Sequence, residues 1–273
     1  MRPPVRVGAV NYLNTKPLIH NLDALAPQAI LTLDVPSRLA DQLAGGELDV
    51  ALIPVIEYYR GTGYTIVPDI AIATRGPVLS VTLFSRVPWP AIRRVALDEG
   101  SRTSAALTQV LLRQRYGVRP DVVPLPINAP AEAADADAVL LIGDRAMKSC
   151  LPGCRFAYDL GQEWLDWTGL PFVYAVWAVR PGADLRGVDA ALREAKEQGL
   201  AHVGAIAARE AGRLGLDAGF CRRYLETLIR FDLGPRELAG LERFYERAAD
   251  QGLAPAGRAL RYYRGAKAPA LSR

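Results

Sequence analysis

Strand-like segments alternate with helical segments along the first half of the chain, and this alternation constrains the fold more than any other feature. In the first unit, residues 5–10 read as a short strand, residues 11–17 as a polar turn, and Pro17 as part of the first helical turn. Further strand-like runs lie at residues 29–35, 47–54, 66–72, 78–84, 94–97, 122–125 and 138–142. Alternation of this kind predicts an α/β fold in which helices pack on the faces of a parallel sheet.

Interruptions of this pattern predict two lobes. Pro88, Trp89 and Pro90 break the chain after the strand at 78–84, and a long apolar strand at 171–179 suits a return into the first sheet. We predict that residues 1–84 and 175–273 form one discontinuous lobe, that residues 85–174 form the other, and that strands 78–84 and 172–179 cross between them. The segments predicted to be packing helices of the first lobe are 190–198, 201–214, 220–231 and 236–250. The tail from Gly265 is predicted to be disordered.

The composition argues against several classes of protein. Half of the 273 residues are apolar, so the chain can build a hydrophobic core. No apolar run approaches the roughly 20 residues that span a bilayer, and no apolar leader opens the chain, so we expect a cytoplasmic protein without a membrane partner. The net charge of +4 suits an anionic ligand, but the basic residues are scattered, which argues against nucleic acid.

The residues that usually bind metals or cofactors are scarce. Cys150 and Cys154 are separated by three residues, which fits neither a zinc knuckle nor a redox motif. The two histidines, His20 and His202, are far apart in the sequence and lie in predicted helices. No glycine-rich nucleotide-binding loop is present. We therefore expect no metal and no cofactor.

Two junctions between a strand and a helix carry clustered Ser, Thr and Asn side chains, at residues 11–17 and 101–104. The free N–H groups and the dipole of a helix N-terminus favour an anion. Two such junctions in facing lobes would suit a small molecule with two carboxylates. Alternatively, these polar side chains are ordinary helix caps. Ser80 and Thr82 share one face of an apolar strand, where they either contact a ligand or satisfy each other.

Six motifs in register resemble the chorismate dehydratases of the futalosine route to menaquinone. They are Val-Gly-Ala-Val-Asn-Tyr-Leu-Asn-Thr-Lys-Pro-Leu (7–18), Gly-Glu-Leu-Asp-Val-Ala-Leu-Ile-Pro (46–54), Ser-Val-Thr-Leu (80–83), Ser-Arg-Thr-Ser (101–104), Leu-Ile-Gly-Asp (141–144) and the segment from Asp159 to Trp177. The resemblance implies a type II periplasmic-binding-protein-like fold: two α/β lobes joined by two crossing strands, with a ligand cleft between them. It also implies dehydration of chorismate, a dicarboxylate, to 3-[(1-carboxyvinyl)oxy]benzoate without a cofactor.

The same resemblance assigns roles to individual residues. Catalytic roles are expected for Asn14 near the reacting centre, for Ser80 on the crossing strand and for Asp144. For Asp144 there are two alternatives, acid–base catalysis and capping of the helix that follows it. The residues expected to bind the substrate are Ser101, Arg102, Thr103, Ser104 and Tyr174 by resemblance, together with Asn11, Thr15 and Thr82 from the polar clusters described above. Of these, residues 101–104 would seat a carboxylate, and Tyr174 faces either the cleft or the core.

None of the better-placed candidates is a strong base at neutral pH. We therefore expect the enolpyruvyl carboxylate of the substrate to take the C3 proton, while Asn14 holds this carboxylate in place. The alternatives are a non-catalytic protein of the same fold that binds a small anion, as a receptor or a sensor, and the paralogous 1,4-dihydroxy-6-naphthoate synthase. The sequence makes no prediction of the oligomeric state.

Overall fold

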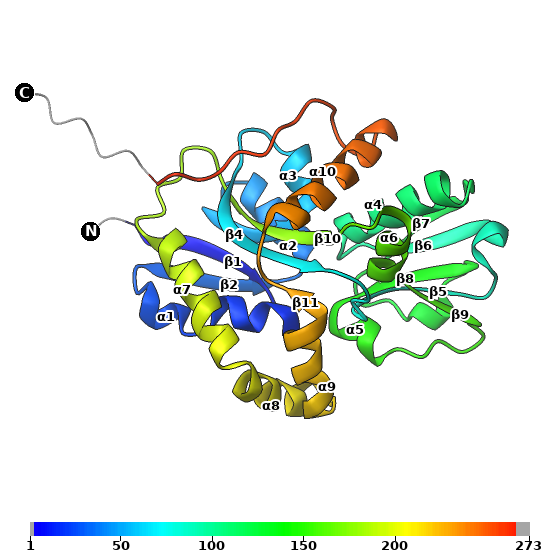
Figure 1. The fold of residues 1–273 in the computed structure, drawn as a ribbon, viewed down its shortest axis with the longest axis horizontal. Helices are drawn as coiled ribbons and strands as arrows, with labels where there is room; N and C mark the ends of the chain where they lie inside the picture. Colours follow the sequence, from blue (N-terminus) through cyan, green and yellow to red (C-terminus); the bar gives the residue numbers. More distant parts are fainter. Residues whose placement is uncertain (1–2, 266–273) are drawn as a thin grey trace, which may run out of the picture.

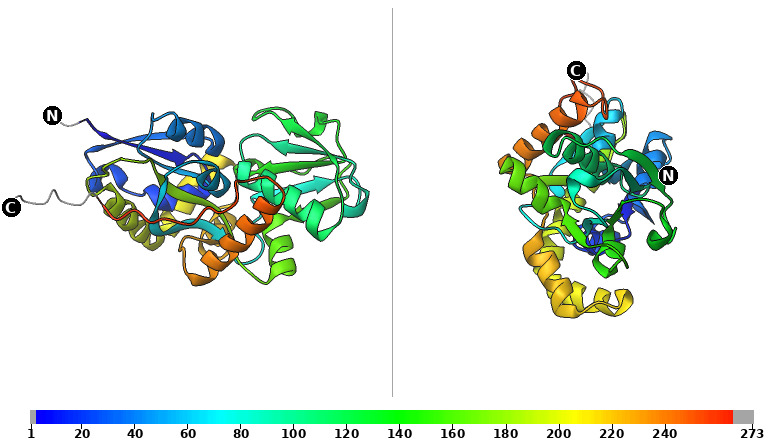
Figure 2. Two further views of the ribbon diagram at one scale, coloured as in Figure 1. Left: turned by 90° about the horizontal axis from the view of Figure 1, so that it is seen from above. Right: turned by 90° about the vertical axis from the view of Figure 1, so that its right-hand side faces the viewer.

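The computed structural model describes residues 3–265, which form two β-sheets, one in each of two lobes (Figure 1). The six-stranded sheet has the strand order β11-β4-β10-β3-β1-β2, and the five-stranded sheet has the order β7-β6-β8-β5-β9. Seen from above, the two sheets lie side by side (Figure 2). The predicted α/β architecture is confirmed. The tail predicted to be disordered lies, from residue 266 onward, outside the described residues.

The first sheet is built from both ends of the chain. Its strands are β1 (Val5–Val10), β2 (Ala29–Asp34), β3 (Val50–Pro54), β4 (Thr65–Thr74), β10 (Phe172–Val179) and β11 (Ile229–Arg230). β1 pairs in parallel with β2 and β3, as predicted. β10 returns from the second lobe and runs antiparallel to both β3 and β4, so the sheet is mixed rather than purely parallel.

The second sheet is mixed as well. Its strands are β5 (Val81–Ser85), β6 (Arg94–Asp98), β7 (Asp121–Leu125), β8 (Ala138–Ile142) and β9 (Phe156–Asp159). β6 pairs in parallel with β7 and β8, whereas β5 runs antiparallel to β8 and β9.

The passages between the lobes differ from the predicted crossing strands. Residues 81–84, predicted to belong to the first lobe, pair in the second sheet, and β10 pairs only in the first. The chain passes between the sheets at residues 75–80 and again through the helix that follows β9. Leu79 has a positive φ angle of 59°, which ends the extended conformation between β4 and β5.

Helices cover the faces of both sheets. In the first half of the chain they are η1 (Leu13–Ile19), α1 (Leu22–Leu25), α2 (Pro36–Ala44), α3 (Val55–Arg60), η2 (Trp89–Ala91), α4 (Arg102–Val110), η3 (Leu111–Arg115) and η4 (Ala131–Ala133). In the second half they are α5 (Gly143–Lys148), α6 (Leu160–Thr168), α7 (Val188–Ala201), α8 (Val203–Leu214), α9 (Ala218–Arg223), η5 (Tyr224–Leu228) and α10 (Pro235–Asp250). The helix predicted at 220–231 is thus divided into α9, a π-helical turn (η5) and β11. Within the part of the chain described, no helix combines the length and apolar composition needed to cross a membrane.

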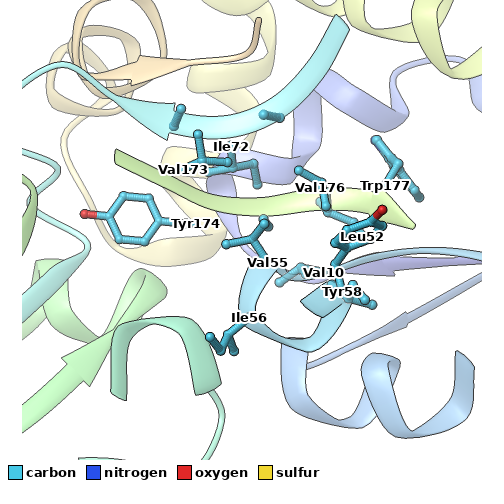
Figure 3. Packing of buried hydrophobic residues seen from close by; sticks show 14 of the residues in the cluster. Val10, Leu52, Val55, Ile56, Tyr58, Ile72, Val173, Tyr174, Val176 and Trp177 are labelled. Carbon is cyan, nitrogen blue, oxygen red and sulfur yellow. The ribbon is translucent and has the colours of Figure 1, made fainter. Parts of the chain in front are cut away.

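One hydrophobic core connects the lobes. The larger of two clusters of buried side chains contains Leu52 and Trp177 from the first sheet together with Leu83 and Leu140 from the second. Around β10, the apolar side chains pack closely, and the ring of Tyr174 points away from Trp177 (Figure 3). α10, from the C-terminal part of the chain, packs against both β10 and α4. This shared packing holds the facing edges of the two sheets in a defined arrangement.

Candidate active site

A cavity lies between the two lobes, and both contribute to its walls. It contains about 490 Å³ of empty space, part of it open to solvent. The first lobe contributes Val10, Tyr12, Asn14, Pro36, Pro54, Ile72, Tyr174 and Ala175. The second lobe contributes Val81, Ser101, Ser104, Ile142 and Gly143, and the connecting segment contributes Val78 and Ser80. The carboxyl ends of β1, β3 and β8 therefore meet at one site, as expected for a ligand cleft in an α/β protein.

The cavity wall is mostly apolar and carries no charged side chain among its lining residues. Its polar members are Tyr12, Asn14, Ser80, Ser101, Ser104 and Tyr174. Burial raises the pKa values of both lining tyrosines, Tyr12 and Tyr174, so each keeps its hydroxyl proton at neutral pH. An anionic ligand in this cavity would be bound by an amide, hydroxyl groups and the N-terminal end of α4 rather than by a cation.

Ser101 is the N-cap of α4, as its place before the helix predicts. Its Oγ accepts a hydrogen bond from the Ser104 N–H at 3.4 Å and donates to the Ser104 Oγ at 2.7 Å. Both hydroxyls also line the cavity, so capping and ligand contact are compatible at this junction.

Asn14 and Ser80 are linked through a tyrosine from the C-terminal part of the chain. The Asn14 Nδ2 donates to the Tyr224 Oη at 3.2 Å, and the Tyr224 Oη donates to the Ser80 Oγ at 2.8 Å. All three side chains are buried. The junction at 11–17 and the connecting segment that carries Ser80 thus converge on one wall of the cavity.

The segment carrying Ser80 is held by Asp159, the N-cap of α6. The carboxylate of Asp159 accepts hydrogen bonds from the N–H groups of Val78 and Leu79, and from those of Gly161 and Gln162 in α6. Burial raises the pKa of Asp159, although these four donors favour its charged form. The bonds fix the chain just before Ser80 and so determine where its hydroxyl lies.

Asp144 connects the lobes without lining the cavity. Its Oδ1 accepts a hydrogen bond from the Leu13 N–H at 3.1 Å, at the start of η1 in the other lobe. Burial raises the pKa of Asp144, and the bond from Leu13 opposes this shift. The residue therefore caps a helix of the opposite lobe, an arrangement the sequence did not indicate.

Two other residues of the 101–104 junction that were expected to bind the ligand, Arg102 and Thr103, do not line the cavity. Arg102 pairs with Asp41 at 2.8 Å and with Glu57 at 3.2 Å, both from the first lobe. The Thr103 Oγ1 accepts a hydrogen bond from the Ile56 N–H at 3.2 Å. These contacts join the lobes beside the cavity.

Three further expected residues also lie outside the cavity wall. Asn11 is exposed and its Oδ1 accepts a hydrogen bond from Lys16. Thr15 is fully buried behind Asn14, to whose Oδ1 it donates at 3.4 Å. Thr82 donates to the Leu79 carbonyl oxygen. The alternative that the polar side chains at 11–17 are ordinary helix caps does not hold for η1, because no side chain caps it from its own N-cap position, Tyr12.

Comparison with known proteins decides the family. A family model described as "Menaquinone biosynthesis" matches residues 5–250. The chain belongs to this menaquinone-biosynthesis family. It is 34% identical over 270 residues to the chorismate dehydratase of Thermus thermophilus, covering 90% of this chain and 95% of that protein. It is 28% identical over 211 residues to the chorismate dehydratase of Campylobacter jejuni, covering 77% and 79%.

Solved structures support the fold of this member of the menaquinone-biosynthesis family. A protein from Archaeoglobus fulgidus superposes with a TM-score of 0.74 at 18% identity, over 92% of this chain and 98% of that one. The periplasmic aliphatic sulphonate binding protein of Escherichia coli superposes with a TM-score of 0.63 at 16% identity, over 100% of both chains. The predicted periplasmic-binding-protein-like fold is confirmed.

Two residues of the site in this family member were missed from the sequence. Tyr12 lies between Asn11 and Leu13 in the first motif, and its position in the polar turn was a signal that could have been used. Tyr224 gave no local signal, because it lies in a segment that reads as an ordinary packing helix. Its contact with Ser80 spans 144 positions of the sequence.

Gly143 is required by the close approach of Tyr12. Gly143 has a φ angle of 61°, and a Cβ atom there would lie 2.8 Å from ring atoms of Tyr12. We expect Gly143→Ala to lower the free energy of unfolding by about 2 to 4 kcal/mol, from left-handed strain and overpacking together. Denaturant unfolding measures this loss.

Gly117→Ala is the matched control for Gly143→Ala. Gly117 has a similar φ angle of 68°, but nothing lies within 4 Å of the added Cβ. Its loss of stability should therefore reflect backbone strain alone, about 1 to 2 kcal/mol. Equal losses for the two variants would show that the contact with Tyr12 is not tight.

Proposed function

We propose that this protein is a chorismate dehydratase, a carbon–oxygen lyase that eliminates water from chorismate to give 3-[(1-carboxyvinyl)oxy]benzoate. The observation that carries this proposal is the cavity between the lobes that brings Asn14 and Ser80 together with Ser101 and Ser104. The names of the relatives in Thermus thermophilus and Campylobacter jejuni support the same activity. The substrate is a small dicarboxylate, which suits two polar walls facing each other across an apolar interior.

The reaction makes limited chemical demands on the protein. The C3–H bond breaks, its electrons form a ring double bond, and the C4–O bond breaks as the hydroxyl group leaves and takes up a proton. Formation of the aromatic ring supplies the driving force. Holding the base, the C3 proton and the leaving group in the right geometry can be worth roughly 7 to 11 kcal/mol. The apolar walls around Val10, Ile72 and Ile142 keep the bound ring in one place.

The base is the enolpyruvyl carboxylate of the substrate itself, held by the Asn14 amide. No carboxylate, imidazole or amine is among the residues that line the cavity. The two lining tyrosines keep their protons because burial raises their pKa values. A carboxylate that enters with the substrate is therefore the base available at the ring.

Asp144→Asn tests whether the protein supplies the base instead. The Asn Oδ1 can still accept the hydrogen bond from the Leu13 N–H, so the contact between the lobes is preserved. We expect kcat to stay within about fivefold of the wild type, whereas removal of a general base typically lowers a rate roughly 100- to 10,000-fold. Steady-state kinetics with chorismate measures this. Loss of turnover with chorismate binding retained would make Asp144 the base.

The proposed function is tested by titrating the purified protein with chorismate in a calorimeter and following the ultraviolet absorbance of the aromatic product in parallel. Turnover without additives supports the proposal. Saturable binding of chorismate without turnover would instead assign a non-catalytic binding role. If the protein neither binds nor converts chorismate but converts the later pathway intermediate, it is a 1,4-dihydroxy-6-naphthoate synthase.

A further inference from the structure

We propose that Tyr224 is a positioning residue that fixes the direction of the hydrogen bonds between Asn14 and Ser80, so that the Ser80 hydroxyl donates its proton to the bound substrate. This inference rests on the proposed dehydratase function, because it concerns the same cavity. It adds a residue from the C-terminal part of the chain to a site otherwise formed by residues 10–175.

Tyr224 reaches the site from an irregular turn. It is the first residue of η5, where the α-helical pattern of α9 gives way to a π-helical turn, and its side chain is 1% exposed. π-Helical turns are often found at functional sites. Tyr224 does not line the cavity, so its hydroxyl acts on the substrate only through the two side chains that it contacts.

The chemistry of the three groups determines the direction of the bonds. The amide nitrogen of Asn14 can only donate, so the Tyr224 oxygen accepts at 3.2 Å. The single phenolic proton then goes to the Ser80 Oγ at 2.8 Å. Because this Oγ accepts from Tyr224, the proton of Ser80 needs an acceptor elsewhere. Among residues 3–265, the Ser80 Oγ has no other hydrogen-bond partner, and Ser80 lines the cavity.

Tyr224 stays protonated in this arrangement. Burial raises the pKa of Tyr224, and the nearby Asp144 and Asp159 carboxylates add to the shift, while the bond with Ser80 opposes it. The phenol is therefore a fixed donor to Ser80 rather than a base. The substrate oxygen that accepts from Ser80 is either the leaving C4 hydroxyl group or the ring carboxylate. Both gain negative charge as the C3–H and C4–O bonds break, and a donated hydrogen bond stabilises that charge.

The first test is Tyr224→Phe, which keeps the ring and removes the hydroxyl. We expect kcat for chorismate to fall roughly 10- to 100-fold, and KM to change by less than about threefold. The loss in kcat is smaller than the loss expected when a donor that touches the transition state is removed. Tyr59→Phe is the matched control: Tyr59 is also a buried tyrosine, and its hydroxyl has no partner among the described residues. Its kcat should stay within about twofold of the wild type.

The second test is a double-mutant cycle with Ser80→Ala, measured under single-turnover conditions by mass spectrometry so that slow variants remain measurable. If Tyr224 acts through Ser80, adding Tyr224→Phe to Ser80→Ala should lower the rate by less than about twofold further. Multiplicative effects of the two substitutions, or wild-type kcat for Tyr224→Phe, would overturn the inference. Failure of the wild type to convert chorismate would contradict the proposed function instead. The cycle is then measured as the free energy of unfolding, where Tyr224→Phe should cost clearly less in the Ser80→Ala background than in the wild type, because the partner of its hydroxyl is already absent. Additive costs would overturn the inference.

Discussion

Asn14→Asp is expected to lower kcat/KM for chorismate at least about 1,000-fold, which corresponds to about 4 kcal/mol. The substitution keeps the size of the side chain but replaces its amide donor with a carboxylate. That carboxylate would face an anionic substrate in a cavity whose lining residues carry no charge. It could not donate to the Tyr224 Oη, as the Asn14 Nδ2 now does at 3.2 Å. Steady-state kinetics with chorismate measures the effect.

Asn11→Asp is the matched control for Asn14→Asp. This substitution makes the same chemical change three residues earlier in the sequence. The Asn11 side chain, however, is exposed, and its Oδ1 accepts a hydrogen bond from Lys16. We expect its kcat/KM to stay within about threefold of the wild type, because an exposed ion pair with Lys16 is worth at most about 1 kcal/mol. Similar losses for both variants would show that Asn11 also contacts the substrate, or that net charge rather than position determines the effect of Asn14→Asp.

Gly199→Ala is expected to have the largest effect on stability. Gly199 lies in α7, and an added Cβ would be 2.0 Å from the carbonyl oxygen of Pro17 in η1. Backbone atoms cannot move aside as a flexible side chain would, so α7 and η1 must separate. We expect the free energy of unfolding to fall by about 3 kcal/mol or more, at the upper end for overpacking. Since η1 also carries Asn14, the turnover of the folded fraction should fall as well. Denaturant unfolding and kinetics on the same preparation measure both effects.

Gly204→Ala gives the comparison for Gly199→Ala. Gly204 lies in the neighbouring helix α8, and nothing lies within 4 Å of its added Cβ. An alanine at such a position should stabilise the helix by about 0.5 to 1 kcal/mol. Stabilisation by both variants would mean that α7 does not pack against η1 as closely as the structure indicates.

Local features of the site were predictable because they depend on neighbouring residues. Ser101 was predicted to lie at a junction between a strand and a helix, and it caps α4. The polar turn and the strand-like run at 78–84 marked Asn14 and Ser80 as candidates with an alternative left open, and the resemblance to chorismate dehydratases assigned their roles. Both line the cavity together with Ser101, as expected for junctions at facing edges of the two sheets.

The direction of long side chains was not predictable from the sequence. Arg102 lies within the motif at 101–104 but turns toward Asp41 and Glu57, which are 61 and 45 positions away. Whether an arginine faces the ligand or another lobe depends on which carboxylates the fold brings near it. The same holds for Asp144, whose partner Leu13 lies 131 positions away in the other lobe.

The observed boundary between the lobes differs from the predicted one for a similar reason. An apolar run at 78–84 reads as one strand, but pairing begins only at Val81, because Leu79 adopts a left-handed conformation and Asp159 holds the residues beside it. A hydrogen bond from a backbone N–H group to a carboxylate 80 positions away is not visible in a local pattern.

The most direct measurement is mass spectrometry of purified protein incubated with chorismate alone, with Asn14→Asp in parallel. The proposed mechanism predicts a product lighter than chorismate by one water, identical in fragmentation to 3-[(1-carboxyvinyl)oxy]benzoate, from the wild type and almost none from the variant. Recovery of unchanged chorismate from the wild type, at protein concentrations that saturate binding, would contradict it.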